Sequence, residues 1–545
     1  MRIGILIKDF NQLDDWELEI IRRISNDPSL KICLLIKDGR QEINTLKTKL
    51  KRLFKSKYII GKILFELQRK IESIIFRDKV TKDYREVLDY LESIESINLY
   101  PQKKGFLDIF RADESEKVKS YSLDIILWHE FNIIKGEILN ASKYGIWSFH
   151  HGDNSIMRGG PTGFWEIIQQ QGVIGITLQQ LTPELDGGNI IEKGFYNIHW
   201  SCVKNAKTVR EQSVTILIKN IKKLQNGQFN PTKSYVYYNK LYKTPKLTVV
   251  IKYIFMFYFQ LIKKILEKAK WKFLGIRFLC WTLFIGKSKF IESSLFRLEP
   301  IKLPKGVFYA DPFLFKNNNK LYVFFENYSY KKKLAKISCG IIKNNKIIEI
   351  IDVLEKSYHL SYPQIFEEDG DIYLMPETSE NKRLELYRCI DFPSKWELFS
   401  TAFESESISD TTYYRDETGQ RWLFVNKGFG NFWNSELYLY KINSLKMETI
   451  EEHKQNPVII DSRIARNAGP LFKYQNMIIR PSQNNSKGIY GYGLNLNEVL
   501  ELNIDNYVEK RIISIKPNFS KGLVSVHHLH QLDNVFVIDG AYSSY

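Results

Sequence analysis

The 545-residue chain lacks several features that would place it in a familiar class of protein. Its five cysteines are scattered and never spaced as CxxC, which argues against a disulfide framework and against a zinc site. No GxGxxG follows the first predicted strand, so the sequence does not indicate dinucleotide binding of the Rossmann type. The amino terminus lacks the apolar core and cleavage site of a signal peptide. We therefore expect a cytoplasmic protein without a metal centre.

Acidic residues are few relative to basic ones, and the formal net charge is +17. Such a balance favours an anionic partner, which could be a phosphate-rich substrate, a nucleic acid or an acidic membrane surface. Hydrophobic residues make up 44% of the chain, enough for globular folding. The chain is too long for a single core, so two or three domains are expected.

The first part of the chain alternates between predicted strands and helices. Arg2 to Ile7 and Lys31 to Ile36 are short apolar runs on either side of a helical segment, Trp16 to Ser25. The same rhythm resumes with a buried strand from Asp124 to Trp128 and another from Ile146 to Phe149. Strands that alternate with helices in this way predict an α/β Rossmann-like domain with a parallel sheet.

Candidate catalytic residues lie at the ends of two predicted strands. Ser148 and His150 are at the carboxyl end of one strand, and Asp186 is in the loop after the next. Ligands of open α/β sheets bind beyond the carboxyl ends of strands, so we expect His150 and Asp186 to meet at one site. A histidine with a carboxylate is the minimal set for proton transfer.

The run 144–194 resembles the catalytic region of the 10-formyltetrahydrofolate-dependent formyltransferases. Their pattern is roughly N-x-H, then a loop with R-G-x-x-P, then L-D-x-G. The matching segments here are Ser148-Phe149-His150, Arg158-Gly159-Gly160-Pro161 and Leu185-Asp186-Gly187-Gly188. The stretch from Asp124 also matches in layout, with His129, Glu130 and Phe131 at the loop that helps form the folate pocket.

This resemblance implies an enzyme with 10-formyltetrahydrofolate as cofactor, His150 and Asp186 as catalytic residues, and Arg158 and Gly159 shaping a loop over the site. Ser148 stands where the family has Asn, and a lost oxyanion donor costs roughly 3–4 kcal/mol in other enzymes. Ser148 would therefore be a weaker donor, with His151 as an alternative. The implied acceptor is an amino sugar on a nucleotide or lipid carrier. The barrel domain of the tRNA-modifying group is not visible, so no nucleic acid partner is expected.

Residues 245–288 are strongly apolar and basic, with Glu267 as the only acid. Their longest apolar run, Tyr253 to Phe259, is far shorter than the ~20 residues that span a bilayer. Basic, Trp-bearing helices of this kind are typical of the membrane interface, which makes an anionic membrane surface a predicted partner and the inner face of the membrane a predicted location. The alternative is a helical connector packed between two domains.

The carboxyl-terminal half is rich in predicted strands and repeats itself. Each of five stretches has a small polar start, a strand, a tight polar turn and a second strand ending in polar residues. They recur around Asp311, Tyr362, Asp410, Gly469 and His528, about 48 to 59 residues apart. Four short strands per unit at this period predict an all-β five-bladed propeller.

The first strands of propeller blades face one central channel, so their polar residues are expected to converge. The predicted pocket consists of Asp311, Glu326, Glu377, Asp410, Arg480 and His528. Arg480 would offset part of the negative charge or hold an anionic group. Paired carboxylates are also what glycoside chemistry requires.

This half resembles the five-bladed arabinanase- and invertase-like hydrolases, whose first blade carries a motif like Ala310-Asp311-Pro312. It resembles more closely the propeller domain of plant glucosamine inositolphosphorylceramide transferases, in which glycosyl transfer is assigned to another domain. A glycan-binding domain and a glycosidase or transglycosidase both remain open.

The sequence thus predicts three parts: an α/β formyltransferase-like domain over residues 1–238, a basic amphipathic helical linker over 239–298, and a five-bladed propeller over 299–545. The leading hypothesis is formyl transfer to an amino sugar of a glycan or glycolipid precursor, with a glycan-binding propeller. The alternative is a membrane-peripheral glycan-binding or glycan-processing protein with a degenerate formyltransferase-like scaffold, and Ser148 is the residue that favours it.

Overall fold

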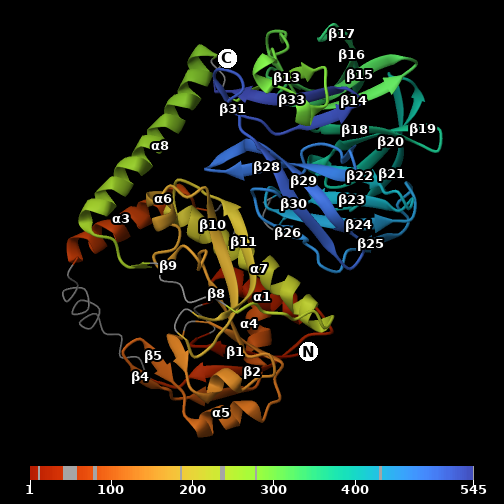
Figure 1. Cartoon of the computed structure of the whole chain (residues 1–545). Coiled ribbons are helices and arrows are strands. Elements are labelled where there is room, and N and C mark those ends of the chain that lie inside the picture. The colour runs from red at the N-terminus through yellow and green to blue at the C-terminus, as the bar shows by residue number, and fades with distance from the viewer. Residues whose placement is uncertain are drawn as a thin grey trace. The chain divides into compact units, whose positions relative to one another are not determined.

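The computed structural model describes residues 1–9, 13–40, 58–77, 83–129, 131–184, 187–233, 240–275, 279–428 and 433–543 (Figure 1). The chain forms two compact units. Unit 1 comprises Met1–Gly194 and Ile198–Gln260, and unit 2 comprises Phe195–Asn197 and Leu261–Tyr545.

Unit 1 is built on a seven-stranded sheet with the order β11-β10-β8-β6-β1-β2-β3. Its strands are β1 (Arg2–Ile7), β2 (Lys31–Asp38), β3 (Ser96–Leu99), β6 (Ile125–Trp128), β8 (Ile146–His150), β10 (Val173–Gln180) and β11 (Asn189–Asn197). The strands from β8 to β3 pair in parallel, and β10 is antiparallel to β8. The parallel α/β core predicted from the apolar runs is confirmed.

Two small sheets and seven helices surround this sheet in the described part of unit 1. The small sheets are β4 (Gln102–Lys104), β5 (Leu107–Ile109) and β7 (Ile133–Lys135), and the pair β9 (Arg158–Gly159) with β12 (Leu241–Tyr242). The helices are α1 (Asp15–Ser25), α3 (Ile59–Ile75), α4 (Arg85–Glu92), α5 (Ala112–Lys119), α6 (Trp165–Ile168), α7 (Cys202–Gln225) and α8 (Leu247–Leu274), and the last of these continues into unit 2. Among the residues described, no helix is both long and apolar enough to span a bilayer.

Unit 2 contains five antiparallel sheets, which follow one another along the chain. The first is β14 (Val307–Asn317), β15 (Lys320–Ser329), β16 (Leu334–Lys343) and β17 (Lys346–Leu354); the second is β18 (Ser361–Glu368), β19 (Asp371–Glu377), β20 (Leu384–Asp391) and β21 (Lys395–Ala402). The third is β22 (Ser409–Arg415), β23 (Arg421–Asn426), β24 (Glu436–Ile442), β25 (Ile450–Glu452) and β26 (Ile459–Ile460); the fourth is β27 (Phe472–Tyr474), β28 (Met477–Ser486), β29 (Ile489–Leu502) and β30 (Tyr507–Ile515).

The fifth sheet combines β13 (Cys280–Gly286), which lies in the range predicted as linker, with β31 (Leu523–Ser525), β32 (Leu529–Leu532) and β33 (Val535–Tyr542). β13 pairs with β33 along its whole length, so strands from both ends of unit 2 share one sheet. The sequence predicted five strand-rich units of about four strands, and unit 2 has five small sheets. Their arrangement as the blades of a propeller stays a prediction.

The first three sheets repeat one backbone irregularity. The pairing of their first two strands shifts in register after Ala310, Ser361 and Ser409. The next residue in each case, Asp311, Tyr362 or Asp410, has a left-handed φ of 50°, 46° or 43°. The sequence repeat is therefore a structural repeat, because residues at the same phase adopt the same unusual backbone conformation.

Candidate functional site

A cavity of about 280 Å³ lies beyond the carboxyl ends of β6 and β8 in unit 1. Ser148 and His150 of β8 line it, and so does Phe131 from the loop after β6. Trp128, Ile134 and Phe149 add apolar surface, while Asn132, Gln179 and Thr182 add polar groups. The structure thus brings three predicted site residues to one cavity. Glu130 and Asp186 lie outside the described residues.

The loop after β8 holds the His150 ring in place. The Nε2 atom of His150 lies 2.7 Å from the carbonyl oxygen of Met157, to which it donates as the protonated ring nitrogen. A side chain at Gly152 would begin 3.0 Å from this Nε2, so glycine leaves room for the imidazole. The loop itself is fixed by Asp153, whose carboxylate accepts hydrogen bonds from Lys193 Nζ at 2.6 Å and Ser155 Oγ at 2.5 Å.

His151 is turned toward helix α7 rather than toward the cavity. Its ring stacks on Phe149, and its Nε2 lies 3.2 Å from the hydroxyl of Ser213. Burial lowers the pKa of His151 to about 3, so the ring is neutral at physiological pH. In this orientation His151 does not replace the missing Asn as an oxyanion donor.

His129 does not line the cavity either. Its Nδ1 lies 2.8 Å from Oε1 of Glu17 in α1, and both side chains are buried. Burial raises the pKa of Glu17, but the hydrogen bond and the charge of His129 outweigh it and lower the pKa overall. Helix α1 therefore supplies a charged partner at the base of the loop that carries Phe131, although no sequence motif marks Glu17.

Arg158 and Gly159 form strand β9, which pairs with β12. They border a separate cavity of about 10 Å³ together with Glu166, whose pKa burial raises to about 7. A side chain at Gly159, where φ is 83°, would begin 2.2 Å from the carbonyl oxygen of Tyr242. Gly159 thus lets the RGGP loop pair closely with β12.

Sequence reasoning missed the network that orients Asn132. Its backbone and side-chain nitrogens both donate to Oδ2 of Asp108 at 2.9 Å, and Arg40 donates to Oδ1 of Asp108 at 2.7 Å. Asp108 is fully buried. These residues lie far apart in the chain and match no motif, so only the fold brings them together.

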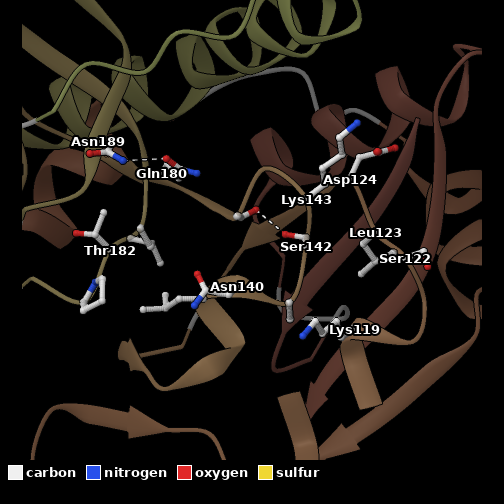
Figure 2. Close-up of a pocket in the computed structure, with 15 residues that line it drawn as sticks. Lys119, Ser122, Leu123, Asp124, Asn140, Ser142, Lys143, Gln180, Thr182 and Asn189 are labelled. Carbon is white, nitrogen blue, oxygen red and sulfur yellow. Dashed lines mark hydrogen bonds between the residues drawn. The ribbon is translucent and has the colours of Figure 1, made fainter. Parts of the chain in front are cut away.

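A second hollow of about 690 Å³ lies at the other ends of the same strands (Figure 2). Its lining includes Lys119, Asp124 and Lys143, and Asn189 donates to Gln180 at 3.0 Å across its wall. None of the predicted site residues within the described ranges lines it. We assign the candidate site to the cavity of about 280 Å³ that Ser148, His150 and Phe131 line.

In unit 2, first-strand residues from several sheets meet in the interior. The backbone nitrogen of Tyr362 donates to Asp311 Oδ2 at 3.3 Å, and the side-chain nitrogen of Asn467 donates to the carbonyl oxygen of Asp410 at 2.9 Å. The Tyr362 hydroxyl accepts a hydrogen bond from the backbone nitrogen of Gly469 at 2.9 Å. Residues near the repeat positions of neighbouring sheets are therefore in direct contact, and their convergence on one ligand pocket stays a prediction.

Glu377 and Asp410 share one arginine. Arg466 Nε donates to Asp410 Oδ2 at 2.6 Å, and its Nη2 lies 3.9 Å from Glu377 Oε2. Glu377 also accepts hydrogen bonds from the hydroxyls of Ser409 at 2.5 Å and Ser379 at 2.8 Å.

The two carboxyls differ in protonation as a result. Burial raises the pKa of Asp410 to about 7, and the nearby charge of Glu377 adds to the rise while Arg466 opposes it. Burial also acts to raise the pKa of Glu377, but its hydrogen bonds and Arg466 lower it overall. Asp410 is thus largely protonated below neutral pH and about half protonated near pH 7, while its neighbour Glu377 is a carboxylate.

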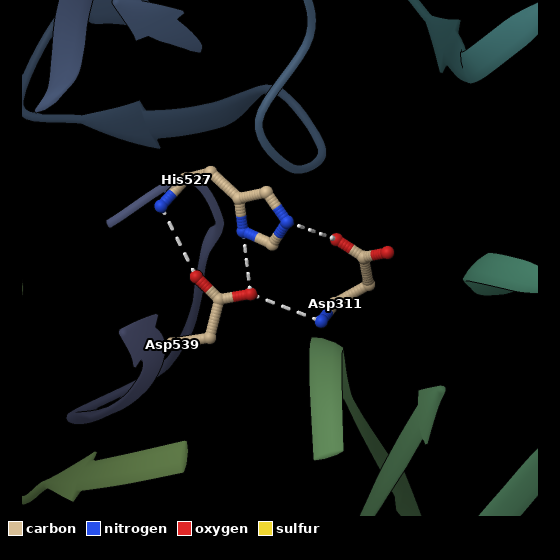
Figure 3. Close-up of side chains that lie close together, drawn as sticks. All are labelled: Asp311, His527 and Asp539. Carbon is tan, nitrogen blue, oxygen red and sulfur yellow. Dashed lines mark hydrogen bonds and ion pairs between the residues drawn. The ribbon is translucent and has the colours of Figure 1, made fainter. Parts of the chain in front are cut away.

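Asp311 lies beside a different cation, His527 (Figure 3). The Nδ1 of His527 is 2.7 Å from Asp539 Oδ2, and its Nε2 is 3.7 Å from Asp311 Oδ1. Burial lowers the pKa of His527, but the two carboxylates raise it to about 9. The donor atoms of Asp311, His527 and Asp539 lie within 4.8 Å of one another, a spacing that would suit a metal ion. With a pKa of about 9, the His527 imidazole is protonated near neutral pH and itself supplies the positive charge between the two aspartates.

The remaining predicted pocket residues have other partners. Glu326 lies 3.2 Å from His359 Nε2, while His528 is fully buried between the rings of Phe313 and Tyr362, and burial lowers its pKa. Arg480 does not contact Asp410: its guanidinium binds both oxygens of Glu509, at 2.7 and 2.8 Å. Arg466 occupies the position that the sequence analysis gave to Arg480.

Comparison with known proteins supports both resemblances in part. Residues 302–542 match the family described as glucosamine inositolphosphorylceramide transferase 1, N-terminal. The glucosamine inositolphosphorylceramide transferase 1 of Oryza sativa subsp. japonica is 33% identical over 208 residues, which are 37% of this chain and 27% of that protein. The chain thus matches about a quarter of the length of this plant relative.

Part of the chain is also similar in sequence to formyltransferases. The methionyl-tRNA formyltransferase of Bacillus cytotoxicus is 31% identical over 130 residues, 23% of this chain and 41% of that enzyme. Among solved structures, the N-formyltransferase from Helicobacter canadensis, in complex with folinic acid and dTDP-3-aminofucose, is 14% identical. That alignment covers 56% of this chain and 94% of the other, with a TM-score of 0.29.

Proposed function

We propose that unit 1 transfers a formyl group from 10-formyltetrahydrofolate to the amine of an amino sugar, carried on a nucleotide or a lipid. The observation that carries the proposal is the His150 ring, held by Met157 at the wall of a cavity that Ser148 and Phe131 also line. The sequence similarity to a methionyl-tRNA formyltransferase, 31% identity over 130 residues, also supports the proposal. A protein at the cytoplasmic face of a membrane that modifies glycan or glycolipid precursors fits these features.

The residues that line the cavity fit the ring portion of a folate. Phe131 and Trp128 offer apolar surface, and Asn132, oriented by Asp108, offers a fixed amide. The cofactor would supply the activated one-carbon group. Because Nε2 of His150 donates to Met157, the other ring nitrogen, Nδ1, would hold or move a proton at the reacting centre, while the hydroxyl of Ser148 would donate a hydrogen bond to developing negative charge. Asp186 is proposed to orient His150 or to accept the proton of the amine.

Variants of these residues test the proposal directly. The protein would be incubated with 10-formyltetrahydrofolate and a panel of nucleotide-linked amino sugars, and products would be read by mass. His150→Ala and Asp186→Ala should each lower turnover by at least ~10²-fold, the usual contribution of a positioned acid–base group. Unchanged turnover in both variants would remove the site assignment. Ser148→Asn should raise turnover if the hydroxyl is the weaker donor, and lower it if the site is built around the hydroxyl.

We further propose that the five sheets of unit 2 form a five-bladed propeller whose interior groups bind a glycan. Two observations support this arrangement. Asp311, Tyr362 and Asp410 share one left-handed backbone conformation, and the backbone nitrogen of Tyr362 donates to Asp311. The relatives that match this region are named as glycolipid-modifying transferases, although the chain covers only part of them. Glu377→Gln should abolish binding in glycan-array or calorimetric measurements while the circular dichroism spectrum stays unchanged.

A specific observation favours a second function for unit 2. Glycoside cleavage needs one protonated and one ionised carboxyl group, and Asp410 and Glu377 differ in pKa in that sense. A glycosidase or transglycosidase would release a reducing sugar from the bound glycan, and Asp410→Asn would stop the release without stopping binding.

A separate measurement distinguishes an active unit 1 from a scaffold. An increase in the thermal stability of the protein on addition of folate would favour the enzyme.

A further inference from the structure

Helix α3 buries one narrow face and leaves a wide apolar face exposed. Gly61, Phe65, Gln68 and Glu72 are its buried residues, spaced as one side of a helix. The apolar stripe on another side consists of Ile60, Ile63, Leu67, Ile71 and Ile74, which are 65, 48, 53, 39 and 75% exposed. An amphipathic helix normally turns its apolar face inward, so this exposed stripe is a candidate interaction surface.

Helix α8 shows the same arrangement. Val250, Tyr253 and Phe257 are fully buried. On the opposite side Phe255 and Phe259 are 73 and 67% exposed, and Ile251 lies between them and the start of the helix. Spacing by four residues places these three side chains in one line along the helix.

The two helices contact each other along their buried faces. A side chain at Gly61 of α3 would begin 2.8 Å from the backbone nitrogen of Leu247, where α8 begins. Farther along, the hydroxyl of Tyr253 donates to Glu72 at 2.6 Å. Two neighbouring helices of unit 1 therefore each carry an exposed apolar stripe.

Exposed lysines accompany both stripes. Lys252, Lys263 and Lys270 of α8 are spaced by 11 and 7 residues, which places them along one side of the stripe. Lys70 is exposed on α3. Within α8, Glu267 is the single acid among six lysines. This combination of large apolar side chains and lysines matches a surface that has anionic head groups over hydrocarbon.

We propose that α3 and α8 together bind the surface of an anionic lipid bilayer. The apolar stripes would enter the boundary between head groups and acyl chains, and the lysines would pair with phosphates. The sequence favoured a membrane-surface role for the range that contains α8 and left one open for the basic stretch 46–80, which contains α3; the structure places the two helices in contact. If unit 1 has the proposed function, binding of this kind would bring it to the surface that carries a lipid-linked acceptor.

Vesicle binding of the full chain tests the proposal. The protein would be sedimented with phosphatidylcholine vesicles, with and without phosphatidylglycerol, at low and high salt. Leu67→Glu and Phe255→Glu should each reduce the partition coefficient about tenfold or more, because each replaces a buried apolar contact by a charge. Leu500→Glu is the matched control, since Leu500 of unit 2 is 54% exposed against 53% for Leu67. It should sediment like the wild type.

Binding should also depend on phosphatidylglycerol and weaken with salt, because the attraction to head groups is screened over about 10 Å at 0.1 M. Equal reductions in all three variants, or sedimentation that ignores lipid charge and salt, would overturn the proposal. So would an oligomer in sedimentation velocity that Leu67→Glu dissociates, because the stripe would then be covered by a second copy. Circular dichroism of each variant would show that the helices remain folded.

Discussion

Asp410→Asn isolates the unusual protonation of the unit 2 interior. In the folded protein Asp410 Oδ2 accepts hydrogen bonds from Arg466 at 2.6 Å and Gln483 at 3.1 Å. An Asn oxygen can accept the same two bonds, and the new amide can donate to the hydroxyl of Ser409, now 3.3 Å from Oδ1. Arg466 keeps Glu377 as a charged neighbour, so the substitution removes a titration while preserving the contacts.

The pKa of Asp410 is about 7 in the folded protein, against the ordinary value of 3.8. Between these pH values the folded state keeps a proton that the unfolded state has released. The free energy of unfolding must therefore fall as pH rises through this range. The full difference corresponds to about 4 kcal/mol, of which about 2 kcal/mol is lost between pH 5 and pH 7. The Asn variant has no such loss, so its stability relative to the wild type should rise by about 2 kcal/mol over this interval.

Denaturant unfolding followed by tryptophan fluorescence at pH 5 and pH 7 measures this difference. Asp533→Asn serves as the control, because the Asp533 side chain is 69% exposed and its removal should leave the pH dependence unchanged. The pKa of His527 is raised from 6.5 to about 9, so its contribution to the free energy of unfolding is fully present below pH 6.5 and is lost as pH rises through about 9. The interval stops at pH 7 to keep most of that change out of the measurement. If the variant and the wild type have the same slope, Asp410 is ionised in the folded state and the reasoning fails.

Two other substitutions test partners that the structure assigns. Arg480→Met should destabilise unit 2 by about 3–5 kcal/mol, because it leaves the buried carboxylate of Glu509 without its cationic partner, yet it should not change glycan binding. Glu72→Gln should lower the free energy of unfolding by about 1–3 kcal/mol, because Tyr253 and Ser201 donate to different oxygens of Glu72 and Gln replaces one of these oxygens by a donor. The same fluorescence measurement checks it, with the exposed residue Glu116 changed to Gln as control.

The strands of unit 1 could be predicted because their signal is local. Arg2 to Ile7 is an apolar run, and β1 occupies the same residues. The order of the strands follows less directly, since β6 lies beside β1 only after more than a hundred residues have intervened, and β8 in turn pairs with β6. The placement of His150 at a carboxyl end follows from strand direction alone, whereas the Asp108–Asn132 contact joins strand β5 to the loop after β6.

The polar interior of unit 2 shows where sequence reasoning stops. Periodicity placed Asp311 and Asp410 at the same phase of the repeat, and both have the same left-handed backbone; their convergence on one pocket stays a prediction. Arg480 and Arg466 lie in the same repeat, and neither position nor residue type tells which one turns inward to the carboxylates. The partner of Arg480 is Glu509, on another strand of its own sheet, and a pairing across that distance has no local signature. His527 was overlooked for the neighbouring His528 because both lie in the short segment between β31 and β32, where no alternation of sides tells which ring faces the carboxylates.

The left-handed backbone shared by Asp311, Tyr362 and Asp410 also indicates where a ligand would contact unit 2. A non-glycine residue adopts this conformation at some cost, which its side-chain contacts must offset. Tyr362 does so by packing against Phe313 and bonding Thr412 at 2.7 Å.

The two carboxyls at the same phase therefore differ in what remains for a ligand. Asp311 lies beside the cationic ring of His527, which Asp539 holds. Asp410 instead shares Arg466 with Glu377. The side chains of Arg466 and Glu377 are 10 and 11% exposed. The side chain of Asp311 is 9% exposed, so a sugar hydroxyl or phosphate that reaches this interior could contact Asp311 as well as Arg466 and Glu377. Substitution at Glu377 and substitution at Asp311 should therefore each weaken glycan binding.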